Sequence, residues 1–177
     1  AIGVPHPDGP LVLDFSTSAT AEGKVRVKKI AGERCPEGWL LDSEGKPTTD
    51  PTTLYGDPPV SILPMGGSQA YKGFGLSLMI EILTGALSGG RCAHDPLHPK
   101  NGNCVFMLLL APDHFGGQAH FAAEVGELAK YVRDCPRADG VDEIILPGDP
   151  ERKMFAARSD SGIPLDDENW SKLTELA

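Results

Sequence analysis

Glycine and proline interrupt this chain so often that it can hold few long helices. They supply 21 and 16 of its 177 residues, respectively. Proline fixes φ and lacks an N–H, and glycine tolerates backbone angles that other residues avoid, so both favour turns. The breaks are densest in residues 33–68, where residues 39–41 form a short apolar piece. We therefore predict a long loop there that is packed by its own side chains.

Two segments carry the periodicity of amphipathic helices. Residues 70–87 place apolar side chains three and four positions apart, which gathers them on one face, and Gly89 and Gly90 then stop the pattern. Residues 118–132 show the same spacing. A shorter, lysine-rich helix is predicted from about Ala19 to Gly32, and a terminal one over residues 166–176.

Three apolar runs predict strands. Residues 11–16 are short and rich in β-branched and aromatic character, and residues 103–111 are almost wholly apolar, which is typical of a strand buried on both faces. Residues 141–146 form the third run, and a turn at residues 147–150 follows it. Because helices and strands mix along the chain, the sequence predicts an α/β or α+β fold of about one domain's length.

The charge and cysteine patterns exclude several classes of protein. The net charge is −9 and lysine and arginine form no stripe, so a nucleic acid partner is not expected. Cys35, Cys92, Cys104 and Cys135 form no CxxC pair, which indicates free thiols in a reducing cytoplasm. No apolar stretch approaches the roughly 20 residues of a membrane span. The chain begins at Ala1 without an initiator methionine, which is typical of a piece of a longer protein.

A glycine-rich segment, residues 65–76, precedes and begins the central predicted helix. It fits neither the P-loop, because Lys72 precedes Gly73 and no hydroxyl follows, nor the dinucleotide fingerprint, because Leu78 stands where a third glycine is needed. A helix start nevertheless offers unpaired N–H groups and a positive dipole end, and a lysine there is explained by a nearby anion. The alternative is that the glycines allow tight packing and Lys72 is merely solvated.

An acid and three hydroxyls lie where the first predicted strand ends. Residues 13–18 read Leu-Asp-Phe-Ser-Thr-Ser. A junction of this kind often holds a ligand, but serine and threonine also cap ordinary helices, and by itself capping is the stronger interpretation. His94 and His98 lie close together without an evident third metal ligand, so no metal site is predicted. The chain contains neither of the common hydrolase motifs, Gly-x-Ser-x-Gly and His-Glu-x-x-His.

The order of these segments resembles the malate/L-lactate dehydrogenase family. The matching stretches are LVLDFSTS, PEGWLLDSEGKPTTDP, PMGGSQAYKGFGLSLMIEILTGALSG and ILPGDPE, and they span nearly the whole chain. The resemblance implies a non-Rossmann mixed sheet with packed helices, like that of sulfolactate dehydrogenase. It also implies hydride transfer between NAD or NADP and the C2 carbon of a 2-hydroxy or 2-oxo acid, and a homodimer.

The resemblance also implies which residues hold the cofactor. Three segments contribute: the strand end, the Tyr-Lys pair at the helix start, and the turn near the carboxyl end. The implied residues are Asp14, Phe15, Ser16, Thr17, Tyr71, Lys72, Gly148, Asp149 and Glu151. The family often has Glu in place of Asp149 and an Arg soon after it, whereas here Pro150 intervenes before Glu151 and Arg152. This turn offers both an acid and an arginine, so NAD and NADP both remain open.

No catalytic residue is assigned to this chain. The family's proton-donating His and the Arg residues that hold the substrate carboxylate lie in an amino-terminal helical region, and no histidine here matches. Residues 1–177 are therefore expected to be a carboxyl-terminal portion that is inactive alone, with the 89–102 loop as a candidate internal boundary. Two alternatives stay open: a non-catalytic ligand-binding or subunit-interaction module of the same fold, and a cyclic-imine reductase.

Overall fold

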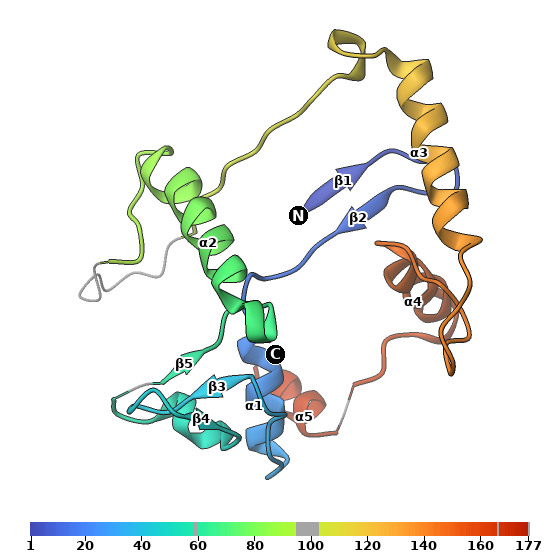
Figure 1. Ribbon diagram of the computed structural model, residues 1–177. Helices are drawn as coiled ribbons and strands as arrows, with labels where there is room; N and C mark the ends of the chain where they lie inside the picture. The colour runs from blue at the N-terminus through green and yellow to red at the C-terminus, as the bar shows by residue number, and fades with distance from the viewer. Residues whose placement is uncertain (59, 95–102, 166, 177) are drawn as a thin grey trace. The chain divides into compact units, whose positions relative to one another are not determined.

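The computed structural model describes residues 1–58, 60–94, 103–165 and 167–176. The chain divides into two compact units, which are described separately. The first unit comprises residues 1–14 and 110–177, and the second comprises residues 15–109. Both contain helices, and short strands accompany them (Figure 1), which confirms the mixed class of fold. Most of the 89–102 loop, the candidate internal boundary, lies outside the described residues.

The second unit is built around a small antiparallel sheet. Its strands are β3 (Leu40–Leu41), β4 (Pro47–Thr48) and β5 (Ser61–Ile62), and β3 pairs with both of the others. Helix α1 (Glu22–Ile30) and the 3₁₀ helix η1 (Pro51–Tyr55) contact each other beside this sheet. The core consists of buried Val25, Cys35 and Leu40, and Trp39, Leu54 and Ile62 pack against it. The prediction that residues 33–68 pack around residues 39–41 is confirmed, but the predicted loop contains three short strands and a 3₁₀ helix.

The central helix of this unit follows a glycine turn. The 3₁₀ helix η2 (Gly67–Gln69) leads into α2 (Ala70–Glu81), and the π-helical turn η3 (Ile82–Ala86) continues it. The predicted helix at residues 70–87 is thus confirmed, and Gly89 with a φ of 76° follows it. Its apolar stripe is left uncovered in the chain, since Met79 is 54% exposed and Leu87 is 65% exposed.

Helix α2 packs against the backbone that precedes it through a single glycine. Gly73 is buried, and a Cβ placed there would overlap the main-chain oxygen of Met65 and lie 2.9 Å from its Cγ. Gly75, two positions later on the same helix, has no such neighbour within 4 Å. The two positions therefore differ. A side chain at position 73 would clash with Met65, whereas a side chain at position 75 would meet no neighbour.

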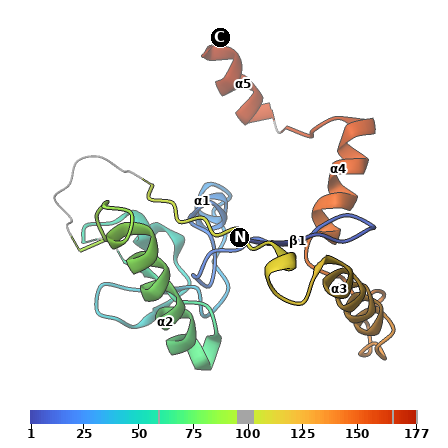
Figure 2. The same ribbon diagram turned by 90° about the horizontal axis from the view of Figure 1, so that it is seen from above.

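The first unit contains a hairpin and three helices. Strands β1 (Ile2–Val4) and β2 (Leu11–Leu13) pair antiparallel, with Gly3 opposite Val12. After the 3₁₀ helix η4 (Pro112–His114) come α3 (Gln118–Arg133), α4 (Asp149–Ser161) and α5 (Asp167–Glu175). Figure 2, the view from above, shows α3 and α4 as separate helices of this unit. The predicted helices at 118–132 and near the carboxyl end are confirmed.

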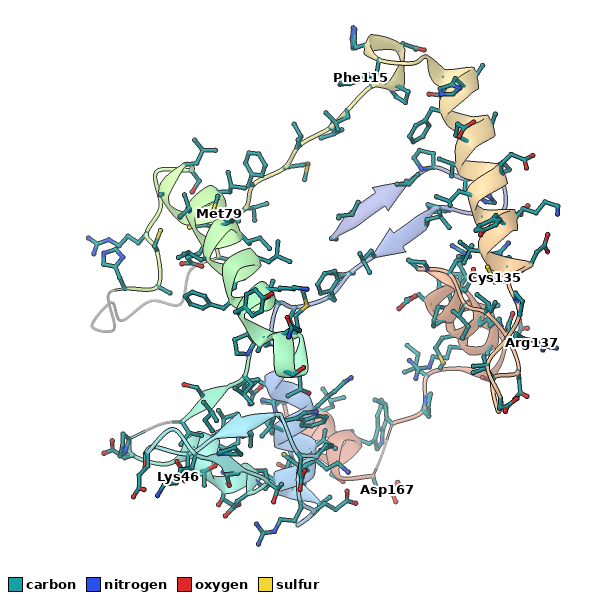
Figure 3. All side chains as sticks on the ribbon, viewed as in Figure 1. Lys46, Met79, Phe115, Cys135, Arg137 and Asp167 are labelled. Atoms are coloured by element: carbon teal, nitrogen blue, oxygen red, sulfur yellow. The ribbon has the colours of Figure 1, made fainter. Side chains whose placement is uncertain are left out.

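The structure contradicts the predicted strand at residues 103–111. The described segment is extended but pairs with no strand in the described parts of the chain, and its side chains are open to solvent. Val105 is 70% exposed and Leu109 81% exposed, and Figure 3 shows side chains projecting from this stretch ahead of Phe115. The apolar pattern identifies a segment that tends to be buried, but a strand also needs a hydrogen-bonding partner.

Two further strand predictions need correction near the ends of the chain. Residues 141–146 form no strand, and helix α4 begins shortly afterwards at Asp149, where a turn alone was expected. The first strand also ends at Leu13 and does not continue to Ser16. Helix α4 escaped prediction because its polar sequence shows little apolar periodicity, while a left-handed glycine, Gly148 with a φ of 94°, and a proline in the first turn begin it.

Asp149 joins the separate elements of the first unit. Its Oδ2 accepts a hydrogen bond from the Leu146 N–H at 2.9 Å, and Nη2 of Arg133, at the end of α3, lies 3.2 Å from its Oδ1. Arg152 also binds Oδ1 and donates to the Pro10 carbonyl oxygen in the hairpin. The side chain is only 12% exposed. The Leu146 N–H first, and then the two guanidinium groups, hold the pKa of Asp149 below its usual value.

We predict that Asp149→Asn destabilises the protein by about 1–3 kcal/mol at pH 7, because the buried Leu146 N–H and two partly exposed guanidinium groups lose a charged acceptor. Because the carboxyl pKa is lower in the folded state, its stabilisation is present above the unfolded value near 3.8 and is lost as pH falls through the folded value. Urea denaturation at pH 7 and at decreasing pH measures both effects. Asp160→Asn, on the exposed part of the same helix, is the control; equal stability of the two variants at pH 7 would contradict the prediction.

A second prediction compares the two glycines of α2. Gly73→Ala should lower the free energy of unfolding by about 1–3 kcal/mol, since the new methyl group displaces the Met65 backbone. Gly75→Ala should raise it by up to about 1 kcal/mol, because alanine favours a helix and meets no neighbour. Thermal and urea unfolding of the two variants provide the comparison. The same sign of change in both would show that the Met65 contact does not constrain α2.

Candidate functional site

The hydroxyl-rich segment after β2 lies alongside the backbone that leads into α2. The Met65 N–H donates to the Thr17 carbonyl oxygen at 2.9 Å, and the Ala19 N–H donates to the Leu63 oxygen at 2.7 Å. An antiparallel bridge links Ser18 and Pro64 between them. Met65 is also the residue that Gly73 contacts. Met65 thus contacts the hydroxyl-rich segment through its N–H group and α2 through its carbonyl oxygen.

The glycine turn between Met65 and α2 is also required by geometry. Gly66 has a φ of 117°, and a Cβ there would lie 2.8 Å from the Gln69 carbonyl oxygen. Residues with a side chain rarely adopt this backbone conformation, so the turn favours glycine. This turn leads into α2, whose first turn holds Tyr71 and Lys72.

The serine hydroxyls do not cap the following helix, which contradicts the capping interpretation. Helix α1 begins at Glu22, and no side chain accepts a hydrogen bond at its start. Instead the Ser18 hydroxyl donates to the Thr20 carbonyl oxygen at 2.7 Å, and the Oγ atoms of Ser16 and Ser18 are 2.8 Å apart. Since the only hydroxyl hydrogen of Ser18 is used, Ser16 must donate to Ser18. Ser16 is exposed, and its oxygen can still accept.

Lys72 is exposed and has no carboxylate partner among the described residues. Its Nζ lies 5.9 Å from the centre of the Tyr71 ring, and Tyr71 is 66% exposed. The start of α2 has neither a side-chain cap nor an acidic residue in its first turn. The positive dipole end of a helix and a nearby ammonium group favour an anion electrostatically. The geometry is equally that of a solvated lysine, so the anion role stays a prediction.

The four candidate residues of the first unit have different surroundings. Asp14 is exposed just after β2. Gly148 is buried against the hairpin, because a Cβ there would lie 3.1 Å from the Pro10 oxygen and 3.2 Å from the Val12 nitrogen. Asp149 is bound by Leu146, Arg133 and Arg152, as described above, which favours a positioning role over direct contact with a ligand. Glu151 remains exposed in the first turn of α4.

Sequence reasoning missed the partners that hold these candidates in place. Arg152 lies three residues after Asp149, a helical spacing that could have indicated the ion pair. Arg133 lies 16 residues earlier and carries no such signal. Met65 is the first residue of the glycine-rich segment 65–76. Its residue type does not indicate that its backbone links residues 17–19 to α2. These contacts depend on the fold, and residue spacing alone does not reveal them.

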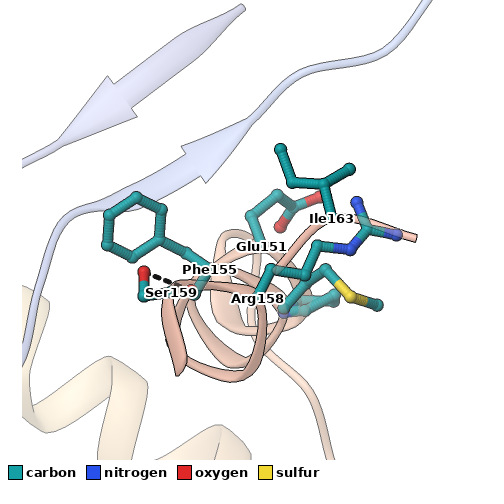
Figure 4. Close-up of a pocket in the computed structure, with 7 residues that line it drawn as sticks. Glu151, Phe155, Arg158, Ser159 and Ile163 are labelled. Atoms are coloured by element: carbon teal, nitrogen blue, oxygen red, sulfur yellow. Dashed lines mark hydrogen bonds between the residues drawn. The ribbon is translucent and has the colours of Figure 1, made fainter. Parts of the chain in front are cut away.

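Glu151 also lines an open pocket on α4 (Figure 4). The pocket has a volume of about 560 Å³ and is mainly apolar. Phe155 and Ile163 contribute apolar surface, and Arg158 contributes a cation. The Ser159 hydroxyl is turned back to the Phe155 carbonyl oxygen at 2.8 Å, so it does not offer its hydrogen to a ligand.

The candidate residues fall in both units. Asp14, Gly148, Asp149 and Glu151 belong to the first, and Phe15, Ser16, Thr17, Tyr71 and Lys72 belong to the second. Of the two histidines considered as metal ligands, His98 lies outside the described residues. Among the residues that are described, no three His, Cys, Asp or Glu side chains gather where they could bind a metal. None of the described helices combines the length and apolar character that crossing a bilayer requires.

Comparison with known proteins places this arrangement in a family. The sequence profile for malate/L-lactate dehydrogenase matches residues 1–174. L-lactate dehydrogenase of Cupriavidus necator is 39% identical over 178 residues, which cover 98% of this chain and 50% of that protein. The chain spans about half the length of the curated relatives it matches.

Solved structures agree with the sequence comparison. Sulfolactate dehydrogenase from Methanocaldococcus jannaschii matches with a TM-score of 0.74 and 29% identity, over 98% of this chain and 49% of that one. Delta1-piperideine-2-carboxylate reductase from Pseudomonas syringae pvar. tomato matches with a TM-score of 0.75 and 31% identity, over 99% of this chain and 51% of that one. With a profile match over residues 1–174 and these relatives, the chain belongs to the malate/L-lactate dehydrogenase family.

Proposed function

We propose that this chain is the cofactor-binding, carboxyl-terminal portion of an NAD- or NADP-dependent oxidoreductase. The enzyme transfers a hydride between the nicotinamide and the C2 carbon of a 2-hydroxy or 2-oxo acid such as malate or lactate. The observation that carries the proposal is Lys72, which has no carboxylate partner among the described residues, at the start of α2 beside the hydroxyl-bearing segment at residues 16–18. Membership of a dehydrogenase family gives this anion-favouring geometry its chemical meaning.

The residues present fit a dinucleotide. The ammonium group of Lys72 and the positive dipole end of α2 provide positive charge for a phosphate. The exposed Ser16 oxygen can accept from a ribose hydroxyl, and Tyr71 offers an exposed ring face. When bound, the cofactor supplies the nicotinamide that accepts or donates the hydride. The role of this chain is to bind and orient it; Asp149 holds the Gly148 turn against the hairpin, and Glu151 projects from that turn.

The proposed mode of binding does not use a Rossmann sheet. Every strand pair found in the described residues is antiparallel, whereas the dinucleotide crevice of a Rossmann fold lies at the carboxyl ends of parallel strands. Instead, a backbone pairing between residues 17–19 and 63–65 supports the lysine-bearing helix. This architecture favours the non-Rossmann, sulfolactate dehydrogenase-like assignment.

Proton transfer is assigned to residues beyond this chain. The reaction needs a proton donor near the substrate oxygen and a cation that holds the substrate carboxylate, and no histidine of this chain matches the proton donor that the family resemblance implies. The exposed apolar surfaces of α2 and residues 105–110 favour a covering partner, in keeping with the proposed homodimer. The four free thiols agree with a cytoplasmic location.

A second candidate substrate is a cyclic imine. It is favoured by one observation, the similarity to the piperideine-2-carboxylate reductase structure over 99% of this chain. The same nucleotide site would serve a C=N bond, so the choice depends on the residues that contact the substrate. Rates of NAD(P)H oxidation by the whole enzyme with oxaloacetate, pyruvate and a cyclic imino acid separate the two candidates.

We predict that Lys72→Ala weakens binding of NADH or NADPH by roughly 10- to 100-fold, which corresponds to the loss of a charge-assisted hydrogen bond. Fluorescence titration of the reduced nucleotide gives the dissociation constant. Lys24→Ala removes the same charge from an exposed position on α1 and should leave the affinity unchanged. Equal affinity of the Lys72 variant and the wild type would refute the proposed site, whereas equal weakening in both variants would indicate only a general effect of charge.

A further prediction concerns catalysis. The 177-residue chain alone should not oxidise NAD(P)H in the presence of 2-oxo acids, because the proton donor and carboxylate clamp are supplied elsewhere. The longer polypeptide from the same reading frame should be active. Robust turnover by the short chain would contradict this assignment. A full-length protein that binds no nucleotide would favour the alternative of a non-catalytic module.

A further inference from the structure

Two cysteine sulfur atoms border the same turn at the end of α2. The turn runs through residues 85–90, and glycine stands at both of its contact points. A Cβ on Gly85 would lie 2.9 Å from the Sγ of Cys92, and a Cβ on Gly90 would overlap the Sγ of Cys104. The same Cβ on Gly90 would be 3.4 Å from the Gly85 carbonyl oxygen, so the two contact points are adjacent. The absence of side chains at both glycines leaves room for the two sulfur atoms.

The first of these cysteines is anchored to the helix. The Cys92 thiol donates to the Glu81 carbonyl oxygen at 3.6 Å, and the next residue, Ala93, donates its N–H to the Glu81 Oε1 at 2.6 Å. The Sγ of Cys104 lies against the same turn, at Gly90. Both thiols are partly accessible, so a small oxidant can reach them.

The other two cysteines differ in their surroundings. Cys35 is 3% exposed in the core of the second unit, and burial raises the pKa of its thiol, which disfavours the reactive thiolate. Cys135 belongs to the first unit, where its thiol donates to the Tyr131 carbonyl oxygen at 3.4 Å. Within the second unit, Cys92 and Cys104 are therefore the two accessible thiols, and they share one turn.

We propose that Cys92 and Cys104 form a reversible disulfide under oxidising conditions, closed across the Gly85–Gly90 turn. The oxidant is a low-molecular-weight disulfide such as glutathione disulfide. One cysteine thiolate attacks a glutathione sulfur, which forms a mixed disulfide and releases one glutathione thiolate. The second cysteine thiolate then attacks the protein sulfur of that mixed disulfide and releases the other glutathione. Two protein thiols are oxidised, and one glutathione disulfide is reduced to two thiols.

The disulfide would act on the far end of the proposed nucleotide-binding helix. It joins the two sides of the intervening loop beside the Gly85–Gly90 turn, where Cys92 also contacts Glu81, the last residue of α2. The first turn of the same helix carries Lys72. The proposal does not depend on the function assigned to that first turn. It marks a modification site and a means by which cellular redox state could reach the helix.

Peptide mapping tests the disulfide directly, because trypsin cuts between the two cysteines. Cleavage after Arg91, Lys100 and Lys130 places Cys92 in peptide 92–100 and Cys104 in peptide 101–130. The purified chain is equilibrated with reduced and oxidised glutathione, its remaining thiols are alkylated, and the digest is analysed by mass spectrometry. We expect the two peptides to appear as one linked species in oxidising buffer and as separate alkylated peptides after reduction.

Three variants make the outcome decisive. Cys92→Ser and Cys104→Ser should each abolish the linked species, and Cys135→Ser should retain it. Glutathione adducts that persist on both separate peptides would overturn the proposal, as would a disulfide to Cys35 or Cys135 or one between two chains. Circular dichroism before digestion shows whether each variant remains folded; a linked species formed only in unfolded protein would also count against the proposal.

Discussion

The backbone of Met65 is the contact on which the second unit depends. Its N–H is bound to Thr17, and its carbonyl oxygen lies against Gly73, so one residue fixes both the hydroxyl-rich strand end and the helix that carries Lys72. Neither contact uses a side chain that a sequence pattern would single out. Main-chain hydrogen bonds are obligatory when they are buried, so this small link has a large influence on the arrangement around it.

In the first unit an electrostatic contact has the corresponding role. Asp149 receives a main-chain N–H and two guanidinium groups from separate elements, and Gly148 beside it allows the turn to approach the hairpin. A carboxylate surrounded by donors stays ionised and cannot also bind a ligand strongly with the same oxygen atoms. The contacts of Asp149 therefore favour a positioning role, in which it holds the turn that carries Glu151.

Much of the helical structure could be predicted from the sequence, because apolar spacing and glycine stops are local signals. Helices α2 and α3 lay close to their predicted ranges, and the packing around Leu40 was also predicted. The strands were less predictable, since residues 103–111 have the composition of a buried strand but no partner in the described chain. The same holds for the candidate site. Its motif residues could be named from the sequence, but the contacts of Met65 and Arg133 that position them form only when the chain folds.

The uncovered apolar stretch at residues 105–110 has a consequence for the life of the chain in the cell. Val-Phe-Met-Leu-Leu-Leu contains no charge and no proline, and it is extended and open to solvent. Six residues of this character match the segments that stack edge to edge into fibrils. A stretch of this kind is prone to aggregation for as long as no other segment or chain covers it.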